Sequence, residues 1–349
     1  MKACLTPLLP LALSAALLTG CEREPERPAP APAPHTSPAA AEYAALAAAF
    51  TEESAPQLRK LVVAAPGFRE AVGALLERPD DTRLHTARNA WTLLYQGFNR
   101  AWPVLATRTT LAPSLARPLA RADIWPILPG YVDAVPGWPE SGLVYDVTLT
   151  LNTDTLIAQQ DMTDPAEVSV GLQVLHLLLF GLPDAPRAPL DVTAVTELLP
   201  SHQLPLSELP ENRRRAYLDA ASAILLEDLT ALVQPAHDDV PPRTLAAALM
   251  QALADSYLRL ARLAALEGAT ATDGGEFMSS DVREIAMTET RAAVDQWLNA
   301  DSPQHQALMA LLNKLDVHYA NALIEQVTAE PQDAAALAQL LSTPPEGLF

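Results

Sequence analysis

Apolar side chains recur every three or four residues through most of this chain beyond residue 40, and this period restricts the fold more than any other feature. Such spacing places the apolar side chains of an α helix on one face. It predicts helices over 218–232 and 245–263, with stop signals at Pro235, Pro241-Pro242 and Gly268. The longest stripe covers about five turns. It comprises Leu308, Leu311, Leu312, Leu315, Tyr319, Leu323 and Val327.

The first half of the chain carries the same pattern near 41–62, 82–100 and 165–180. Helices of this kind each bury one apolar face against their neighbours. Roughly 310 residues follow the N-terminal segment described below, enough for one large domain or two of ordinary size. We therefore predict an all-α fold of two antiparallel helical bundles, residues 41–200 and residues 201–349.

One segment departs from helical spacing. Residues 143–151 alternate apolar and more polar side chains, and the apolar positions are Leu143, Tyr145, Val147, Leu149 and Leu151. Alternation is the period of a β strand, whose successive side chains point to opposite faces. The spacing alone predicts a strand here, whereas the family resemblance given below argues for irregular or helical structure.

The first twenty residues resemble an export signal. Lys2 precedes an apolar run over residues 5–18, which is too short to span a bilayer. The run ends in Leu18-Thr19-Gly20-Cys21, which resembles the processing box of bacterial lipoproteins. We expect residues 1–20 to be removed and Cys21 to carry the lipid that attaches the protein to a membrane. An ordinary secretory signal is the alternative.

The residues after the cleavage point indicate where the protein is held. Glu22 rather than aspartate follows Cys21, which by resemblance to Gram-negative sorting favours the outer membrane, with the body facing the periplasm. Residues 21–40 are rich in proline and alanine and lack large apolar side chains, so we predict an extended tether. Cys4 and Cys21 are the chain's two cysteines, and signal removal and lipidation leave neither for a disulfide or a metal site.

Composition and motifs exclude several classes of function. The formal net charge is −19 at pH 7, which repels the phosphate backbone of nucleic acids. No basic stripe interleaved with aromatic residues offsets this charge, so we expect no nucleic-acid partner. The sequence also lacks H-E-x-x-H, G-x-S-x-G and a glycine-rich phosphate loop.

A run of motifs between residues 125 and 181 is more specific. It comprises Trp125-Pro126, Tyr131-Val132-Asp133, Gly137, Pro139, Ser141-Gly142-Leu143-Val144 and the segment 171–181, which reads GLQVLHLLLFG. This run resembles the imelysin family, exported bacterial proteins often linked to iron, whose hallmark is GxHxxE followed by apolar residues and glycine. Arg187, Asp191 and the arginines 213–215 resemble further patterns of that family. The resemblance spans most of the body and implies an imelysin-like pair of helical bundles.

The polar positions of the hallmark have changed. Gln173 stands where the family has histidine, and His176 stands where it has glutamate. The family also places an arginine and a glutamate on the helix near residue 91, where this chain has Tyr95 and Trp102. These replacements remove the obvious metal ligand and general base of a hydrolase, so the sequence favours a non-enzymatic protein.

Gln173 and His176 are nevertheless the first candidate site. They lie three residues apart in an apolar segment and therefore share one face of a buried helix. His176 could bind a metal, with iron, zinc or haem as candidates, and Asp133 beside Tyr131 could add a carboxylate if its loop folds back. The alternatives are an interhelical hydrogen-bonded pair for Gln173 and His176 and a turn-stabilising role for Asp133.

Three further residues complete the candidate ligand-binding set. Arg187 and Asp191 could form an ion pair that closes the loop after the hallmark helix. Trp125 could line a pocket for a flat ligand, although tryptophan also fills the cores of helical bundles. The other tryptophans of this half that could join it are Trp91, Trp102 and Trp138.

Three functions follow from the resemblance and its departures. The preferred one is a non-catalytic, periplasm-facing lipoprotein that contributes to iron or haem acquisition by binding a metal, a ligand or an uptake protein. The second is a metallopeptidase, because some imelysins are classified as peptidases. The third is a structural or scaffolding lipoprotein whose site has decayed.

Overall fold

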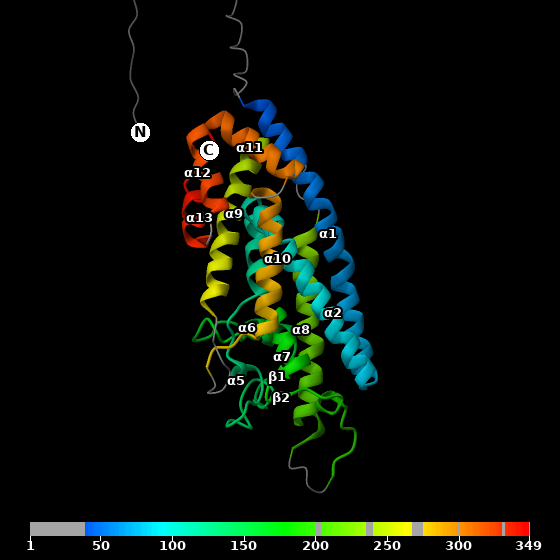
Figure 1. The fold of residues 1–349 in the computed structure, drawn as a ribbon. Coiled ribbons are helices and arrows are strands. Elements are labelled where there is room, and N and C mark those ends of the chain that lie inside the picture. Colours follow the sequence, from blue (N-terminus) through cyan, green and yellow to red (C-terminus); the bar gives the residue numbers. More distant parts are fainter. Residues whose placement is uncertain are drawn as a thin grey trace, which may run out of the picture. The chain divides into compact units, whose positions relative to one another are not determined.

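Figure 1 shows the protein as a computed structural model, which describes residues 39–199, 204–234, 240–266, 275–298, 301–329 and 332–348. Ala39–Phe349 forms one compact unit. Long helices that run side by side build its body, and this confirms the predicted all-α fold. The long helices are α1 (Ala40–Glu77), α2 (Asp81–Arg100), α3 (Trp102–Leu111), α8 (Pro210–Val233), α9 (Pro242–Ala265), α10 (Ser280–Leu298), α11 (Pro303–Leu315) and α12 (Val317–Thr328).

Several of the shorter elements gather at one end of the unit, whereas the last helix packs against α9 away from that end (Figure 1). Within the described ranges the sheet consists of two antiparallel strands of two residues each, β1 and β2. The short elements are α4 (Ala116–Ala122), α5 (Pro129–Val132), α6 (Thr153–Ala158), α7 (Leu172–Phe180), α13 (Ala334–Leu341), β1 (Gly181–Leu182), β2 (Ala185–Pro186) and the 3-10 turns η1 (Pro113–Leu115), η2 (Pro189–Val192) and η3 (Leu206–Glu208).

The apolar stripe over 308–327 belongs to two helices rather than one. Asp316 lies between α11 and α12 with an extended backbone, at φ −157°. Its carboxylate accepts hydrogen bonds from the backbone N–H groups of His318 and Tyr319, at 2.9 and 3.1 Å. An aspartate in this position starts a new helix, because it satisfies N–H groups that have no partner in the preceding turn.

Two glycines set the limits of α7. The predicted helix over 165–180 begins only at Leu172, because Gly171 has φ +99°, a conformation that favours glycine. The helix ends before Gly181, which also has a positive φ, of +76°. The prediction is therefore correct from Leu172 onward and wrong for residues 165–171.

The strand predicted over 143–151 is wrong, since the segment is a series of turns. Arg213 of α8 explains why the segment needs no neighbouring strand. Its guanidinium donates hydrogen bonds to the carbonyls of Leu143 (2.9 Å), Val144 (2.5 Å), Asp146 (2.6 Å) and Leu149 (2.9 Å). One buried arginine thus satisfies backbone groups that a sheet would otherwise have to pair.

Two apolar cores hold the unit together, and α1 contributes to both. Its N-terminal part, with Tyr43 and Leu46, packs in one core with α9 to α13. Its C-terminal part, with Phe68 and Val72, packs in the other core with α2, α7 and α8. Each core therefore contains residues from both sides of position 200, the predicted boundary between the two bundles.

Several predictions concern the N-terminal segment. The signal over residues 1–20, lipidation at Cys21 and the tether up to residue 38 all lie outside the described residues. The tether was predicted to extend to residue 40, where α1 already begins. None of the helices described here combines the length and apolar character needed to cross a membrane.

Candidate functional site

Gln173 lies inside the protein at the start of α7 and bonds to two other segments. Its amide Nε2 donates hydrogen bonds to the Tyr95 hydroxyl of α2, at 3.1 Å, and to Oδ1 of Asp123, at 2.8 Å. Burial raises the pKa of Tyr95 well above its usual value, so its hydroxyl stays protonated. Gln173 thus occupies the place of the family histidine as a hydrogen-bond donor between helices.

Asp123 links Gln173 to a buried arginine. Its Oδ2 accepts hydrogen bonds from Nη2 of Arg259 in α9, at 2.5 Å, and from the indole N–H of Trp125, at 3.2 Å. Arg259 also donates to the side-chain oxygen of Asn99, at 2.7 Å. The side chains of Asp123 and Arg259 are 0 % and 5 % exposed, so each charge depends on the other for compensation.

Two tryptophan rings contact the same arginine. The Arg259 guanidinium carbon lies 4.2 Å from the ring centre of Trp102 and 5.2 Å from that of Trp125. Two cation–π contacts therefore add to the Asp123 carboxylate in compensating this buried cation.

His176 occupies an aromatic cage beside this network. Its ring stacks on Phe180 with centroids 4.3 Å apart and an interplanar angle of 14°, and it lies 4.8 Å from Trp91. Burial, and secondarily the positive charge of Arg88, lowers the pKa of His176 to about 3. The imidazole is therefore neutral at pH 7, and within the described part of the chain it makes no hydrogen bond.

A short strap covers the hallmark face of α7. Phe277 forms a β bridge with Ile127, with N–H···O distances of 3.0 and 2.7 Å in the two directions. Phe277, Met278 and Ser279 enclose a small hollow against Gln173 and His176 that has no room for a water molecule. The hallmark positions therefore lie in a closed site rather than in an open pocket.

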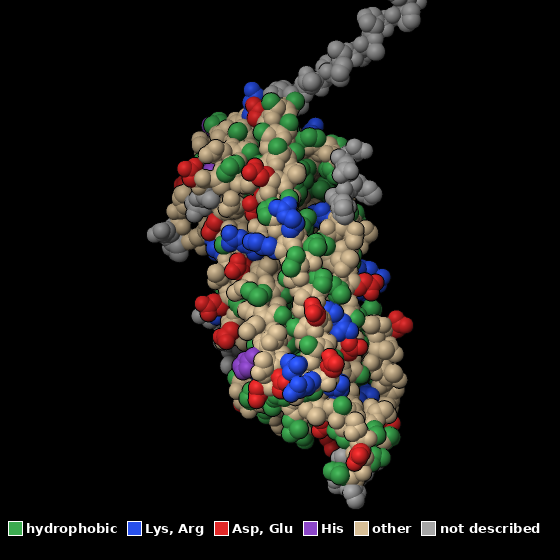
Figure 2. All heavy atoms as spheres, turned by 90° about the vertical axis from the view of Figure 1, so that its right-hand side faces the viewer, with side chains coloured by type: hydrophobic (Ala, Val, Ile, Leu, Met, Phe, Trp, Pro, Cys, Tyr) green, Lys and Arg blue, Asp and Glu red, His purple; other side chains and the backbone are tan. Residues whose placement is uncertain are grey.

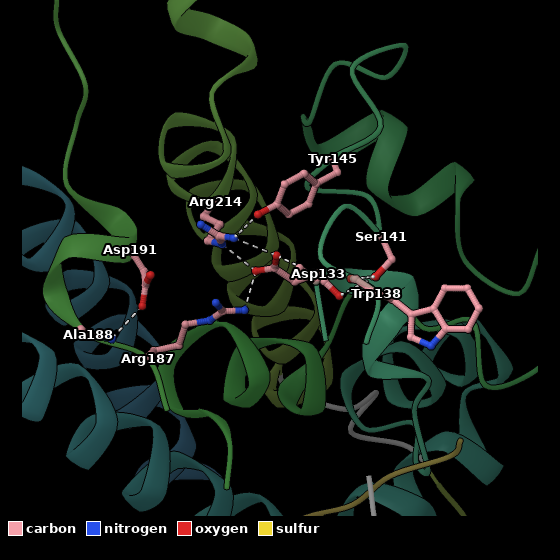
Figure 3. Close-up of polar contacts among 9 residues, drawn as sticks. Asp133, Trp138, Ser141, Tyr145, Arg187, Ala188, Asp191 and Arg214 are labelled. Atoms are coloured by element: carbon pink, nitrogen blue, oxygen red, sulfur yellow. Dashed lines mark hydrogen bonds and ion pairs between the residues drawn. The ribbon is translucent and has the colours of Figure 1, made fainter. Parts of the chain in front are cut away.

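Asp133 forms a second buried cluster with two arginines, shown in Figure 3. Its Oδ2 accepts hydrogen bonds from Nη2 of Arg187, at 2.5 Å, and from Nε of Arg214, at 2.7 Å. Its Oδ1 accepts from Nη2 of Arg214, at 3.1 Å, and from the backbone N–H of Ala134, at 2.8 Å. All four bonds occupy the carboxylate, which is 1 % exposed and has no position left for a metal ion.

Arg214 also bonds to a neighbouring segment, and Arg88 supports the turn beside the cluster. Nη2 of Arg214 donates to the Tyr145 hydroxyl, at 3.1 Å. Burial alone would lower the pKa of Arg214, but the Asp133 carboxylate outweighs it and raises that pKa above its ordinary value. Arg88 supports the neighbouring turn, because it donates to the carbonyls of Leu179 (2.9 Å) and Arg187 (2.8 Å).

The predicted ion pair between Arg187 and Asp191 is wrong. Arg187 points to Asp133, while the Asp191 carboxylate turns away and accepts the backbone N–H of Ala188 at 2.8 Å (Figure 3). Asp191 caps the turn η2 and needs no cation for that role. The arginine instead bonds to the buried carboxylate of Asp133.

The remaining predicted residues have separate places. The Tyr131 hydroxyl donates to the Gln159 carbonyl at 2.5 Å, and burial raises the pKa of Tyr131 to about 12. Trp125 lies in the Asp123 network, whereas Trp138 is 64 % exposed and points away from Asp133 (Figure 3). The tryptophans of this half therefore do not line one common pocket.

The donor groups present do not fit a metal ion. In the ranges that the structure describes, no three His, Cys, Asp or Glu side chains gather closely enough to hold one. His176 offers one neutral imidazole, and the amide nitrogen of Gln173 donates rather than accepts. Asp133 belongs to a different cluster, so the predicted pairing of His176 with Asp133 as metal ligands has no support in the contacts of either residue.

Sequence reasoning missed the charged partners of both clusters. Asp123 and Arg259 are 136 residues apart, and no local motif connects them. Arg259 offered one signal, since it interrupts the apolar stripe of α9 between Leu253 and Leu263. Arg214 is one of the three consecutive arginines 213–215. Only the packing of α8 reveals that Arg213 and Arg214 are buried.

Comparisons with known proteins agree with the motifs. The family model described as Imelysin (Peptidase_M75) matches residues 54–286, more than half of the chain. A search of curated proteins finds no significant match. Among solved structures, the chain is similar to a protein of Parabacteroides distasonis described as an iron-regulated protein A precursor. The identity is 13 %, the TM-score is 0.49, and the match covers 86 % of this chain and 94 % of that one.

Proposed function

Because this chain belongs to the imelysin family, we propose that it is a non-catalytic binding protein that contributes to iron or haem acquisition at the cell envelope. The link to iron comes from the family, whose exported members are often connected with it. The non-catalytic character comes from this chain's own residues at the hallmark positions.

The contacts of the Gln173 and His176 side chains are the observation that supports a non-catalytic role. Gln173 donates its amide to Tyr95 and Asp123, and His176 is stacked between Phe180 and Trp91. Both face a hollow that excludes water. A metallopeptidase needs a metal-bound water and a general base, and this arrangement supports neither role. The hallmark region acts instead as a rigid packing centre, and binding occurs elsewhere on the protein.

Elemental analysis tests the state of the hallmark site. Residues 39–349, the compact unit, would be purified after periplasmic expression beside His176→Phe, which keeps the ring shape and removes both ring nitrogens. We expect no stoichiometric iron or zinc in either protein. A metal present in the wild type and lost in His176→Phe would overturn the non-catalytic reading, as would chelator-sensitive cleavage of a protein substrate.

Growth on limiting iron tests the physiological role. A strain that lacks the gene should grow more slowly on limiting iron or on haem as iron source, and the full-length wild type should restore growth. Full-length His176→Phe should restore growth equally well, because the imidazole makes no hydrogen bond among the described residues. Unimpaired growth of the deletion strain would contradict the role in iron acquisition and favour a scaffolding lipoprotein.

We also propose that lipid on Cys21 holds the protein at the outer membrane, with the body in the periplasm. The processing box that ends at Cys21 and the glutamate that follows it support this placement. Cells would be labelled with a radioactive fatty acid and fractionated, with Cys21→Ala as the matched variant. Label in the wild type alone, found in the outer-membrane fraction, is the expected result. Label in neither protein would contradict the anchor.

A further inference from the structure

A groove of about 950 Å³ runs between α1 and α2, away from the hallmark helix. Its apolar walls include Val63, Ala64 and Phe68 of α1 and Ala90 and Leu93 of α2. Figure 2 shows the face of the molecule that carries α1 and α2, where hydrophobic and basic side chains lie close together. The groove is at the upper end of the size range of small-molecule sites.

Two glycines line the groove. Gly67 of α1 and Gly97 of α2 both line it, so each helix lacks a side chain at that point. A Cβ atom built on Gly67 would meet no other atom within 4 Å. The walls also leave apolar side chains in water, since Val63 is 74 % exposed and Leu93 is 65 % exposed. Exposed apolar groups gathered beside a groove are typical of a binding surface.

The charge around the groove is opposite to that of the protein as a whole. Arg59, Lys60 and Arg100 line it together with one acid, Glu289, in a chain of net charge −19. Arg100 lies 3.7 Å from Glu289. Within the described residues, the side chains of Arg59 and Lys60 make neither an ion pair nor a hydrogen bond. Two cations are therefore free to attract an anionic group of a ligand.

We propose that this groove binds a long-chain carboxylate, with the acyl chain between α1 and α2 and the carboxylate beside Arg59 and Lys60. The lining of α1 extends from Pro56 to Phe68, about 18 Å along the helix axis. A long apolar wall with cations beside it matches an amphiphile that has a single anionic end. Histidine, cysteine, tyrosine and methionine are missing from the lining, so the groove offers none of the usual axial ligands of haem. No residue of α7 lines the groove, so the inference does not rest on the contacts of Gln173 and His176.

Calorimetric titration of residues 39–349, the compact unit without the predicted lipid anchor at Cys21, with hexadecanoate below its micelle concentration tests the ligand class. Hexadecanol and hexadecyltrimethylammonium carry the same chain with a neutral and a cationic end. We expect one hexadecanoate per chain at about micromolar Kd, with weaker binding of the alcohol and none of the cation. Equal binding of all three would overturn the role of the charges, and no binding of hexadecanoate would overturn the site.

Variants locate the ligand in the groove. Leu93→Glu places a carboxylate on the wall at an exposed position, so the protein should fold while its affinity falls at least about tenfold. Gly67→Leu fills the groove and should have a similar effect. The paired change Arg59→Glu with Lys60→Glu should abolish binding, whereas Arg78→Glu, at the exposed end of α1 and outside the lining, should not. Unchanged affinity in Leu93→Glu would overturn the assignment.

Vesicles distinguish the free ligand from a lipid surface. The same chain would be sedimented with phosphatidylglycerol vesicles and with phosphatidylcholine vesicles. The proposal expects no groove-dependent binding to either, because the net charge of the protein repels an anionic membrane. Binding to phosphatidylglycerol that Leu93→Glu removes, without binding of hexadecanoate, would replace the proposal by a membrane-docking surface.

Discussion

The polar clusters around Asp123 and Asp133 differ in how they balance charge. In the first, Asp123 faces one arginine, Arg259, and an amide, Gln173. In the second, Asp133 faces two arginines, Arg187 and Arg214. The first cluster is a neutral pair, whereas the second has an excess of one cation. A single buried acid thus pairs with one arginine in the first cluster and with two in the second, and the cost of removing each partner should differ accordingly.

Loss of the shared acid should be the most damaging change. Asp133→Ala leaves both arginines without their carboxylate, and we expect the free energy of unfolding to fall by about 5 kcal/mol, the upper end for a broken buried pair. Urea unfolding followed by circular dichroism measures it. Asp191→Ala, which removes a turn contact on the neighbouring loop, is the control and should leave most of the stability intact. Equal losses in the two variants would contradict the comparison.

Loss of the arginine in the balanced cluster should come next. Arg259→Met keeps an unbranched apolar stem between Trp102 and Trp125 but strands the Asp123 carboxylate, at a cost of about 3 kcal/mol. Arg262→Met, at an exposed position on the same helix, should have no measurable effect. Adding Asp123→Asn to Arg259→Met should recover part of the loss, and a further drop of full size would show that the two charges act independently.

The first cluster should also respond to pH through its neighbour His176. The pKa of this histidine is lowered by burial and by Arg88 to about 3, from an ordinary 6.5, so the unfolded chain takes up a proton that the folded protein resists. Stability should therefore be full above pH 6.5 and decrease as pH falls towards 3. At pH 5 the free energy of unfolding should have decreased by about 2 kcal/mol less in His176→Phe than in the wild type.

Unfolding of the wild type and of His176→Phe at pH 7.5 and at pH 5 makes this test, with the exposed His85→Phe as control. If the loss on acidification were the same in His176→Phe as in the wild type, the histidine would not be the titrating group.

Removal of one arginine from the second cluster should have the smallest effect. Arg187→Met leaves Asp133 paired with Arg214 by two hydrogen bonds, and Arg187 is the more exposed of the two arginines. We expect a loss of about 1 kcal/mol, clearly below that of Arg259→Met in the same urea experiment. The exposed Arg78→Met controls for loss of a surface charge. A loss as large as that of Asp133→Ala would show that both arginines are needed to compensate the acid.

Local signals in the sequence predicted the helices well and the clusters poorly. The apolar positions of α8 and α9 follow the expected period because a buried face needs it. The break at Asp316 was missed, since the apolar stripe continues through it and only the capping bonds reveal the new helix. The strand expected at 143–151 does not form, because the Arg213 side chain donates hydrogen bonds to backbone carbonyls of this segment that a neighbouring strand would otherwise pair.

The candidate site shows the same limit. The resemblance led to Gln173 and His176, and both lie together on one face of α7 as expected. What each side chain does depends on residues far away in sequence, such as Asp123 for Gln173 and Phe277 for the cover over His176. Long-range partners of this kind leave no period or motif in a single sequence, so the site could be located but not interpreted.

Helix α1 determines how a pull on the N-terminus would enter the fold. The predicted anchor at Cys21 lies on the N-terminal side of this helix, so any pull between the membrane and the body would enter the fold through α1. Because α1 packs in both apolar cores, detaching it would expose apolar surface in each of them. We therefore expect the body to stay folded as one piece under moderate tension. Once α1 detached, both apolar cores would unfold in a single event.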